Sequence, residues 1–185
     1  MALTWARIAM IPLVIGIFYV PDTWFPAHWK NATACWLFVL AAVTDAFDGW
    51  IARRYGMTSP LGAFLDPVAD KLMVSAALIV LLSLGRIDEF VALVMIGREI
   101  AVSALREWMA QIGASRSVAV HMLGKVKTTV QMVAIPFLLF DGPLFRVIDT
   151  RLWGTALIWI AAVLTVWSMV YYLRKALPEI RAKVK

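Results

Sequence analysis

Five uncharged, mostly apolar runs divide this chain, and their lengths constrain its fold more than any other feature of the sequence. Four runs have 13 or 14 residues and the last has 22: residues 8–21, 31–44, 72–85, 128–140 and 152–173. A helix needs about 20 apolar residues to cross a bilayer, so each short run crosses only if a polar helix end completes it. A sixth segment, residues 90–110, carries four charges. We therefore expect an all-α, polytopic membrane protein with six transmembrane helices.

Composition leaves little room for a different architecture. The chain has 185 residues, of which 62% are apolar and 16% are charged, whereas soluble domains are roughly 45–50% apolar. Six spans of about 20 residues would use about 120 of them, so we expect one membrane domain over residues 1–185. The net charge of +6 does not require nucleic acid as a partner, because membrane proteins gather Lys and Arg in their cytoplasmic loops.

The basic residues also predict an orientation. If the chain crosses the membrane at each segment, the polar helix ends all fall on one side. The loops and tail on that side carry eight Lys and Arg residues, and the loops on the other side carry four. Because basic residues are enriched on the cytoplasmic side, we predict that both termini and the polar helix ends lie in the cytoplasm.

Four aspartates lie at the predicted cytoplasmic ends of the second and third segments. Asp45 and Asp48 are three residues apart, and Asp66 and Asp70 are four apart, so each pair shares one face of a helix. The stretch between residues 53 and 62 is short enough to make the two helices antiparallel neighbours. Aspartate is too short to reach far out of the membrane, and an intramembrane carboxylate is by default a functional hypothesis.

Convergence of four carboxylates predicts a metal site. Without cations, such a cluster would repel itself and lose its hydration. Carboxylate oxygens suit Mg²⁺ or Mn²⁺, and two ions held this way are typical of phosphoryl chemistry. Gly49, Ala52 and Gly62 are small residues that serve either close helix packing or space for a nucleotide. Arg53 is suitably placed to neutralise a phosphate.

These residues carry a family resemblance. The pattern Asp45-x2-Asp48-Gly49-x2-Ala52-Arg53-x8-Gly62-x3-Asp66-x3-Asp70 matches in full the signature of the CDP-alcohol phosphotransferases. The resemblance implies a six-helix membrane enzyme, usually a homodimer, that moves a substituted phosphate from a CDP-linked donor to an alcohol and releases CMP. It implies that the four aspartates bind two metal ions and that Asp70 is also the catalytic base. The implied donor site comprises Thr4, Asp48, Gly49, Ala52, Arg53 and Gly62.

A second group of polar residues is basic. Positive-inside topology is one explanation for Arg116, and pairing with Glu99 or Glu107 is a structural explanation for Arg98 and Arg106. An acceptor that bears a phosphate would explain the whole group. The candidate acceptor-binding residues are Arg98, Arg106, Arg116, Lys125 and Lys127.

The sequence around these basic residues indicates which members of the family this chain resembles most. The chain resembles bacterial members of the family whose acceptor is sn-glycerol 3-phosphate at the Thr4-x2-Arg7 pattern and at residues 96–100, 103–110, 117–120, 124–129 and 131–132. This resemblance implies CDP-diacylglycerol as the donor, phosphatidylglycerol phosphate and CMP as products, and an active site on the cytoplasmic face of the bacterial inner membrane. Inositol phosphate, serine and a second phosphatidylglycerol are the alternative acceptors.

A divalent-cation transporter is the alternative from another class, because buried acids in a helical bundle can line a cation pathway. All four aspartates lie near one predicted membrane face, however, and no acidic relay continues through the last two segments. The sequence therefore favours the enzyme.

Overall fold

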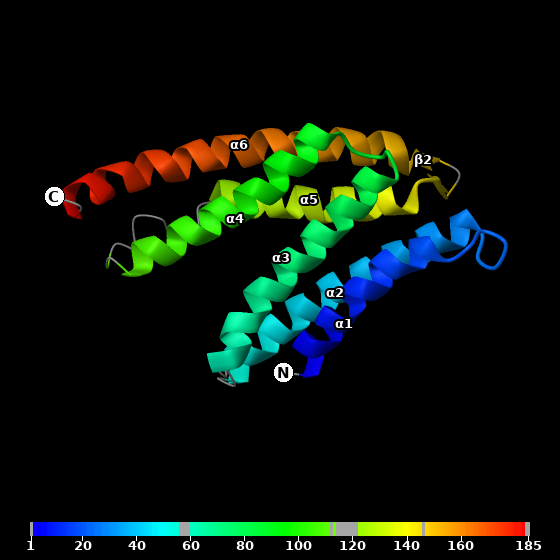
Figure 1. Cartoon of the computed structure of the whole chain (residues 1–185), viewed down its shortest axis with the longest axis horizontal. Helices are drawn as coiled ribbons and strands as arrows, with labels where there is room; N and C mark the ends of the chain where they lie inside the picture. The colour runs from blue at the N-terminus through cyan, green and yellow to red at the C-terminus, as the bar shows by residue number, and fades with distance from the viewer. Residues whose placement is uncertain (1, 56–59, 112, 114–121, 146, 184–185) are drawn as a thin grey trace. The chain divides into compact units, whose positions relative to one another are not determined.

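The structure is a computed structural model, which describes residues 2–55, 60–111, 113, 122–145 and 147–183. Within these ranges, the side chains of residues 2, 3, 48–53, 55, 60, 63, 122, 123, 125 and 179–183 lie outside the description. The described residues form six α-helices: α1 (Ala2–Gly16), α2 (Ala27–Tyr55), α3 (Pro60–Ser83), α4 (Glu89–Gln111), α5 (Met122–Phe140) and α6 (Thr150–Lys183) (Figure 1). A 3-10 turn, η1 (Ile17–Tyr19), follows α1. A short antiparallel pair, β1 (Pro143–Leu144) and β2 (Ile148–Asp149), precedes α6.

The predicted helical class is confirmed, because each of the six predicted segments overlaps a different helix. Each helix includes the charged end next to its apolar run, although α1 ends at Gly16 and α3 at Ser83, before their runs end. Within the described ranges, α6 is the one helix long and apolar enough to cross a membrane, over Thr150–Pro178. Thr4–Tyr19 and Val126–Phe140 form shorter apolar helices. The six membrane crossings and the orientation of the termini remain predictions.

Residues next to the helix ends explain where two helices begin and where one ends. Asp88 Oδ1 accepts a hydrogen bond from Phe90 N at 2.8 Å before α4, and Asp149 Oδ1 accepts one from Arg151 N at 3.0 Å before α6. These carboxylates satisfy N–H groups that have no partner inside the helix. After α3, Gly85 adopts a φ of +64°, which glycine tolerates without strain.

The chain divides into two compact units, and each is described by itself. Unit 1 comprises Met1–Ile87 and Ala134–Thr155, and unit 2 comprises Asp88–Val133 and Ala156–Lys185. In unit 1, α1 packs against both α2 and α3, and these two helices contact each other less than either contacts α1 (Figure 1). Val14, Phe38 and Leu81 are among the fully buried side chains of this unit. The first helix is therefore central to how the two aspartate-bearing helices are held.

Arg86 links three parts of unit 1. Its Nη1 donates to the carbonyl oxygens of Leu138 and Leu139 at 3.0 and 2.9 Å, and its Nη2 donates to Asn31 Oδ1 at 2.8 Å. Asp141 Oδ2 lies 3.2 Å from Nε. Burial lowers the pKa of the Arg86 guanidinium, and the nearby Asp141 carboxylate opposes this shift. These bonds satisfy carbonyl groups at the end of α5 that the helix itself leaves unpaired.

In unit 2, one face of α4 packs against one face of α6. Val102 and Met109 from α4 form a buried apolar cluster with Tyr172 and Ala176 from α6, and Leu105 packs against it. Spacings of three, four and seven residues along α4, and of four along α6, put these side chains on single helix faces. The same faces carry the polar side chains described below.

Candidate active site

One turn of α1 contacts a predicted site aspartate on α2 and another on α3. Thr4 Oγ1 donates a hydrogen bond to Asp66 Oδ1 on α3 at 2.8 Å. Arg7 Nη1 lies 2.6 Å from Asp45 Oδ1 on α2. Thr4 and Arg7 are three residues apart, so they share one face of α1. The first helix therefore ties Asp45 and Asp66, which are 21 residues apart in the chain, into one polar group.

Arg7 is the one charged residue of α1, and it is 2% exposed. A buried guanidinium is unfavourable unless it is paired and hydrogen-bonded, and the ion pair with Asp45 provides part of that compensation. Its Nε and Nη2 have no hydrogen-bond partner among the residues that the structure describes. Arg7 was not among the predicted site residues, and the signal available for it was the Thr4-x2-Arg7 spacing at the start of an apolar helix.

All four signature aspartates lie on helices, as their spacing predicted. Asp45 and Asp48 are on α2, and Asp66 and Asp70 are on α3, where Asp70 is half-buried. The Asp48 side chain lies outside the described residues. Among the side chains that are described, no three or more His, Cys, Asp or Glu residues gather as a metal site. The complete four-carboxylate ligand set therefore remains a prediction.

The described carboxylates have the chemistry and the accessibility that a divalent cation requires. The Asp45 side chain is 43% exposed and Asp66 is exposed, although their partners on α1 are buried. The contacts with Arg7 and Thr4 use only the Oδ1 atom of each carboxylate. Carboxylate oxygens are the ligands that Mg²⁺ and Mn²⁺ prefer. Asp45 and Asp66 therefore fit such an ion as ligands.

The predicted donor-binding residues are described only in part. Gly62 is buried on α3, and Thr4 makes the bond to Asp66 given above. Gly49, Ala52 and Arg53 belong to α2, but their side-chain environment lies outside the description. The structure therefore gives Thr4 a contact with a predicted metal ligand, and its predicted contact with the donor is not tested.

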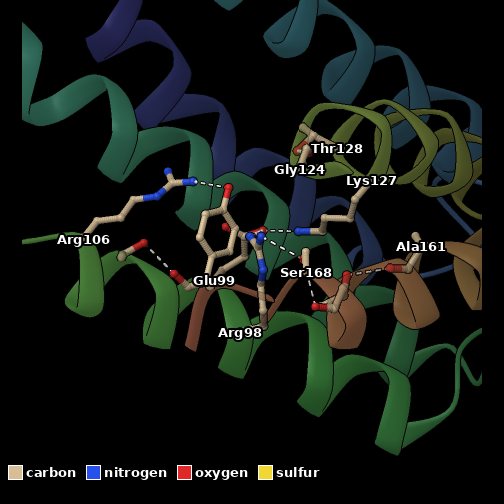
Figure 2. A network of polar contacts seen from close by, with 11 residues as sticks. Arg98, Glu99, Arg106, Gly124, Lys127, Thr128, Ala161 and Ser168 are labelled. Atoms are coloured by element: carbon tan, nitrogen blue, oxygen red, sulfur yellow. Dashed lines mark hydrogen bonds and ion pairs between the residues drawn. The ribbon is translucent and has the colours of Figure 1, made fainter. Parts of the chain in front are cut away.

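Unit 2 brings together three of the five predicted acceptor-binding residues (Figure 2). Lys127 Nζ forms an ion pair with Glu99 Oε1, and Arg98 Nη1 lies 3.4 Å from the same oxygen. Arg98 Nη2 donates to Ser168 Oγ at 3.1 Å, and Arg106 is joined to the group through Tyr172. We call Arg98, Glu99, Arg106, Lys127 and Tyr172 the basic cluster. Arg116 and the Lys125 side chain lie outside the described residues.

The charges of the basic cluster do not balance. Three cations and one carboxylate leave a net charge of +2, and Lys127 and Arg98 are only 1% and 7% exposed. The predicted pairing of Arg98 with Glu99 is present, but it accounts for a single negative charge. Within the described part of the chain, Nε of Arg98 and Nε of Arg106 have no hydrogen-bond partner. A phosphate monoester carries a charge of about −1.5 to −2 and three acceptor oxygens, which would complement this cluster.

Sequence reasoning identified neither Tyr172, a member of the basic cluster, nor Ser168, a hydrogen-bond partner of Arg98. They are four residues apart on α6, so they lie on one helix face. Both belong to the uncharged 22-residue run, where nothing in the sequence distinguishes a face that packs on arginines from a face that meets lipid. Their partners depend on the packing of α6 against α4.

Comparisons with known proteins identify the family of this chain. A family model described as CDP-alcohol phosphatidyltransferase matches residues 1–167, a range that includes every predicted site residue. The chain belongs to this family. Members of the family generally use divalent metal ions. Membership makes the chain a phosphotransferase of phospholipid biosynthesis, which favours the enzyme over the cation transporter.

Curated relatives match almost the whole chain. Proteins of Escherichia coli K12, Shigella flexneri serotype 5b and Shigella sonnei are each 48% identical to it over 177 residues. The match covers 94% of this chain and 92% of each relative. All three relatives are named CDP-diacylglycerol–glycerol-3-phosphate 3-phosphatidyltransferase.

Proposed function

We propose that the chain transfers the phosphatidyl group of CDP-diacylglycerol to sn-glycerol 3-phosphate, giving phosphatidylglycerol phosphate and CMP. The observation that carries this proposal is the 48% identity to enzymes named for that reaction, over 94% of the chain. The proposed metal ligands and the charged residues of the basic cluster lie within the range that matches the family model, residues 1–167. Family membership indicates the type of reaction. The side chains indicate which group binds the metal ions and which group binds the acceptor.

The carboxylates of unit 1 are the proposed metal ligands. Hard oxygen ligands indicate two Mg²⁺ or Mn²⁺ ions, which when bound would neutralise the negative charge that develops on the pyrophosphate. Asp45, Asp48, Asp66 and Asp70 are the proposed ligands. Arg53 adds a cation for the same phosphates, and small residues leave room for the nucleotide. The proposed donor-binding residues are Thr4, Asp48, Gly49, Ala52, Arg53 and Gly62.

Asp70 is the proposed general base. Its carboxylate accepts the proton of the attacking hydroxyl while the hydroxyl oxygen forms a bond to the phosphorus of the phosphatidyl group. The bond from that phosphorus to the bridging oxygen of CMP breaks, and CMP leaves with the electron pair. Correct alignment of hydroxyl, phosphorus and leaving oxygen contributes a further large share of the rate.

The basic cluster is the proposed binding site for the acceptor. Its net charge of +2 and the two Nε–H groups that have no hydrogen-bond partner among the described residues match a phosphate group, which charge-assisted hydrogen bonds recognise. Serine has no phosphate and would leave these charges unbalanced. Arg98, Arg106, Arg116, Lys125 and Lys127 are the proposed phosphate contacts.

The proposed setting is the bacterial inner membrane, with six membrane crossings and with both termini and the active site on the cytoplasmic face. The membrane candidate α6 and the uneven distribution of loop charges support this topology. A site at the inner face would let a lipid donor keep its acyl chains in the bilayer while a soluble acceptor approaches from the cytoplasm. We also propose that residues 1–185 form one catalytic domain that assembles as a homodimer.

An acceptor assay tests the proposed function. The purified full-length protein would be supplied with CDP-diacylglycerol and Mg²⁺, and separately with sn-glycerol 3-phosphate, inositol phosphate or serine. CMP release and labelled lipid product are expected with sn-glycerol 3-phosphate. Product with inositol phosphate alone or serine alone would overturn the proposed acceptor, and no CMP with any of the three would contradict the proposed reaction.

A further inference from the structure

Tyr172 is a buried aromatic residue with two arginines against it. Its side chain is 1% exposed. The guanidinium carbon of Arg98 lies 5.9 Å from the centre of its ring, and that of Arg106 lies 5.3 Å from it. The hydroxyl of Tyr172 accepts a hydrogen bond from Arg106 Nη2 at 3.2 Å. One side chain of α6 thus contacts two cations of α4 that are eight residues apart.

The surroundings of Tyr172 fix the ring in this place. It belongs to the apolar cluster with Val102, Met109 and Ala176. A Cβ atom added to Gly124 on α5 would lie 3.5 Å from the Tyr172 hydroxyl, so the hydroxyl lies close to a point where α5 has no side chain. Close packing leaves a buried ring few alternative positions. Tyr172 can therefore serve as a fixed support for the two flexible arginines.

An aromatic contact leaves part of an arginine available to an anion. The planar guanidinium lies against the ring through its face, whereas its N–H groups lie in its plane and bind carboxylate or phosphate oxygens in pairs. In both arginines, Nε is buried and has no hydrogen-bond partner among the described residues. Buried N–H groups without acceptors are unfavourable, so these two donors indicate an anionic ligand.

We propose that Tyr172 is a positioning residue, which holds Arg98 and Arg106 so that their Nε–H groups are available to the phosphate of the acceptor. The inference rests on the proposed function, because it assumes an acceptor that carries a phosphate. Tyr172 itself does not contact the reacting atoms. It reduces the conformational freedom that the two arginines would otherwise lose on binding.

Two substitutions separate the contributions of the ring and the hydroxyl. Tyr172→Phe keeps the ring and removes the hydrogen bond to Arg106, so the KM for sn-glycerol 3-phosphate should rise roughly 5-fold. Tyr172→Leu removes the ring contacts as well, and this KM should rise roughly 50-fold. In both variants the KM for CDP-diacylglycerol should stay within about 2-fold of the wild type. A general loss of packing would not produce this split.

Tyr171 provides a matched control on the same helix. Its ring packs edge-on against Tyr172 with 6.0 Å between centroids, and its own cation contact is Lys175 Nζ at 5.1 Å. Tyr171→Leu therefore removes packing against Tyr172 and keeps the Tyr172 ring, which contacts Arg98 and Arg106. The acceptor KM of this variant should stay within about 2-fold of the wild type.

Calorimetric titration of sn-glycerol 3-phosphate into the full-length protein gives a readout that does not need turnover. The Kd should rise in the order wild type, Tyr172→Phe, Tyr172→Leu. An unchanged KM and Kd in Tyr172→Leu, or an equal rise in both substrate KM values, would overturn the inference. If Tyr172→Leu does not fold, an unchanged Kd in a Tyr172→Phe protein with wild-type thermal stability would overturn it.

The two proposals fail in different ways. Absence of CMP release from the wild type with sn-glycerol 3-phosphate would contradict the proposed function, whereas the Kd series would still test Tyr172. Normal turnover by the wild type with no Tyr172 effect would remove only the positioning role. Absence of both turnover and binding would overturn both proposals.

Discussion

The aspartate group of unit 1 and the basic cluster of unit 2 arrange opposite charges in opposite ways. In unit 1, the carboxylates of Asp45 and Asp66 are accessible and their partners on α1 are buried. In unit 2, the cations of Arg98 and Lys127 are buried, whereas the Glu99 carboxylate is 22% exposed. The accessible carboxylates of unit 1 are suited to bind a cation. The buried positive charges of unit 2 are suited to bind an anion. We therefore expect the two groups to affect different kinetic constants.

Removal of divalent metal should have the largest effect on activity. Only the aspartate group should be involved in this effect. After exhaustive chelation, we expect kcat to fall by roughly 10³-fold or more, because charge on the pyrophosphate would no longer be neutralised. Mg²⁺ or Mn²⁺ should restore CMP release. A chelator already saturated with Mg²⁺ is the control. Full activity in metal-free protein would contradict the proposed ligand role.

Substitution of the proposed base should have the second largest effect on activity. Asp70→Asn should lower kcat roughly 10³-fold, because an amide cannot accept the proton of the attacking hydroxyl. Asp88→Asn is a matched control, since Asp88 caps α4 and asparagine caps a helix equally well. Thermal unfolding would establish that both variants fold. Normal turnover in Asp70→Asn would remove Asp70 as the base.

Arg7 should increase the affinity for the metal ion through its contact with Asp45. Arg7→Gln removes the charge that lies 2.6 Å from Asp45, and loss of a residue that orients a metal ligand typically weakens metal affinity or activity 10- to 100-fold. The Mn²⁺ concentration for half-maximal activity should rise by that order. In an Asp45→Asn background, Arg7→Gln should have little further effect, because the two residues act as a pair.

Lys30 offers a matched control for Arg7. It is buried on α2 and lies 2.6 Å from Asp22, but it is 15 residues from Asp45, or about 22 Å along the helix. Lys30→Gln should leave the Mn²⁺ requirement unchanged even if it lowers thermal stability. Fully additive losses in the Arg7 and Asp45 double variant would show that Arg7 does not act through Asp45.

Neutralising one cation of the basic cluster should have the smallest effect. Lys127→Met keeps the length of the side chain and removes its charge, so we expect the KM for sn-glycerol 3-phosphate to rise roughly 10-fold. The donor KM should change less than about 2-fold. Arg116→Ala and Lys125→Ala should show the same direction. Equal changes in both KM values would argue against a separate binding site for the acceptor.

The sequence predicted those features that depend on position along one helix. The spacing of Asp45 with Asp48, and of Asp66 with Asp70, requires only helical periodicity, and the structure places all four on helices. The contact of Arg7 with Asp45 depends on the packing of α1 against α2, which no local pattern specifies. Tyr172 shows the same limit, because its role depends on which face of an apolar helix packs against α4. The sequence therefore did not predict which polar residues on different helices contact each other.

In this account, the aspartate group binds metal and the basic cluster binds the acceptor. The most direct test of this assignment measures two constants in each of two variants, Arg7→Gln and Lys127→Met. For each protein, the Mn²⁺ concentration for half-maximal activity and the KM for sn-glycerol 3-phosphate would be measured under the same conditions. The account predicts that Arg7→Gln raises only the first constant and Lys127→Met raises only the second. A rise of both constants by the same factor in either variant, or the reverse assignment, would contradict it.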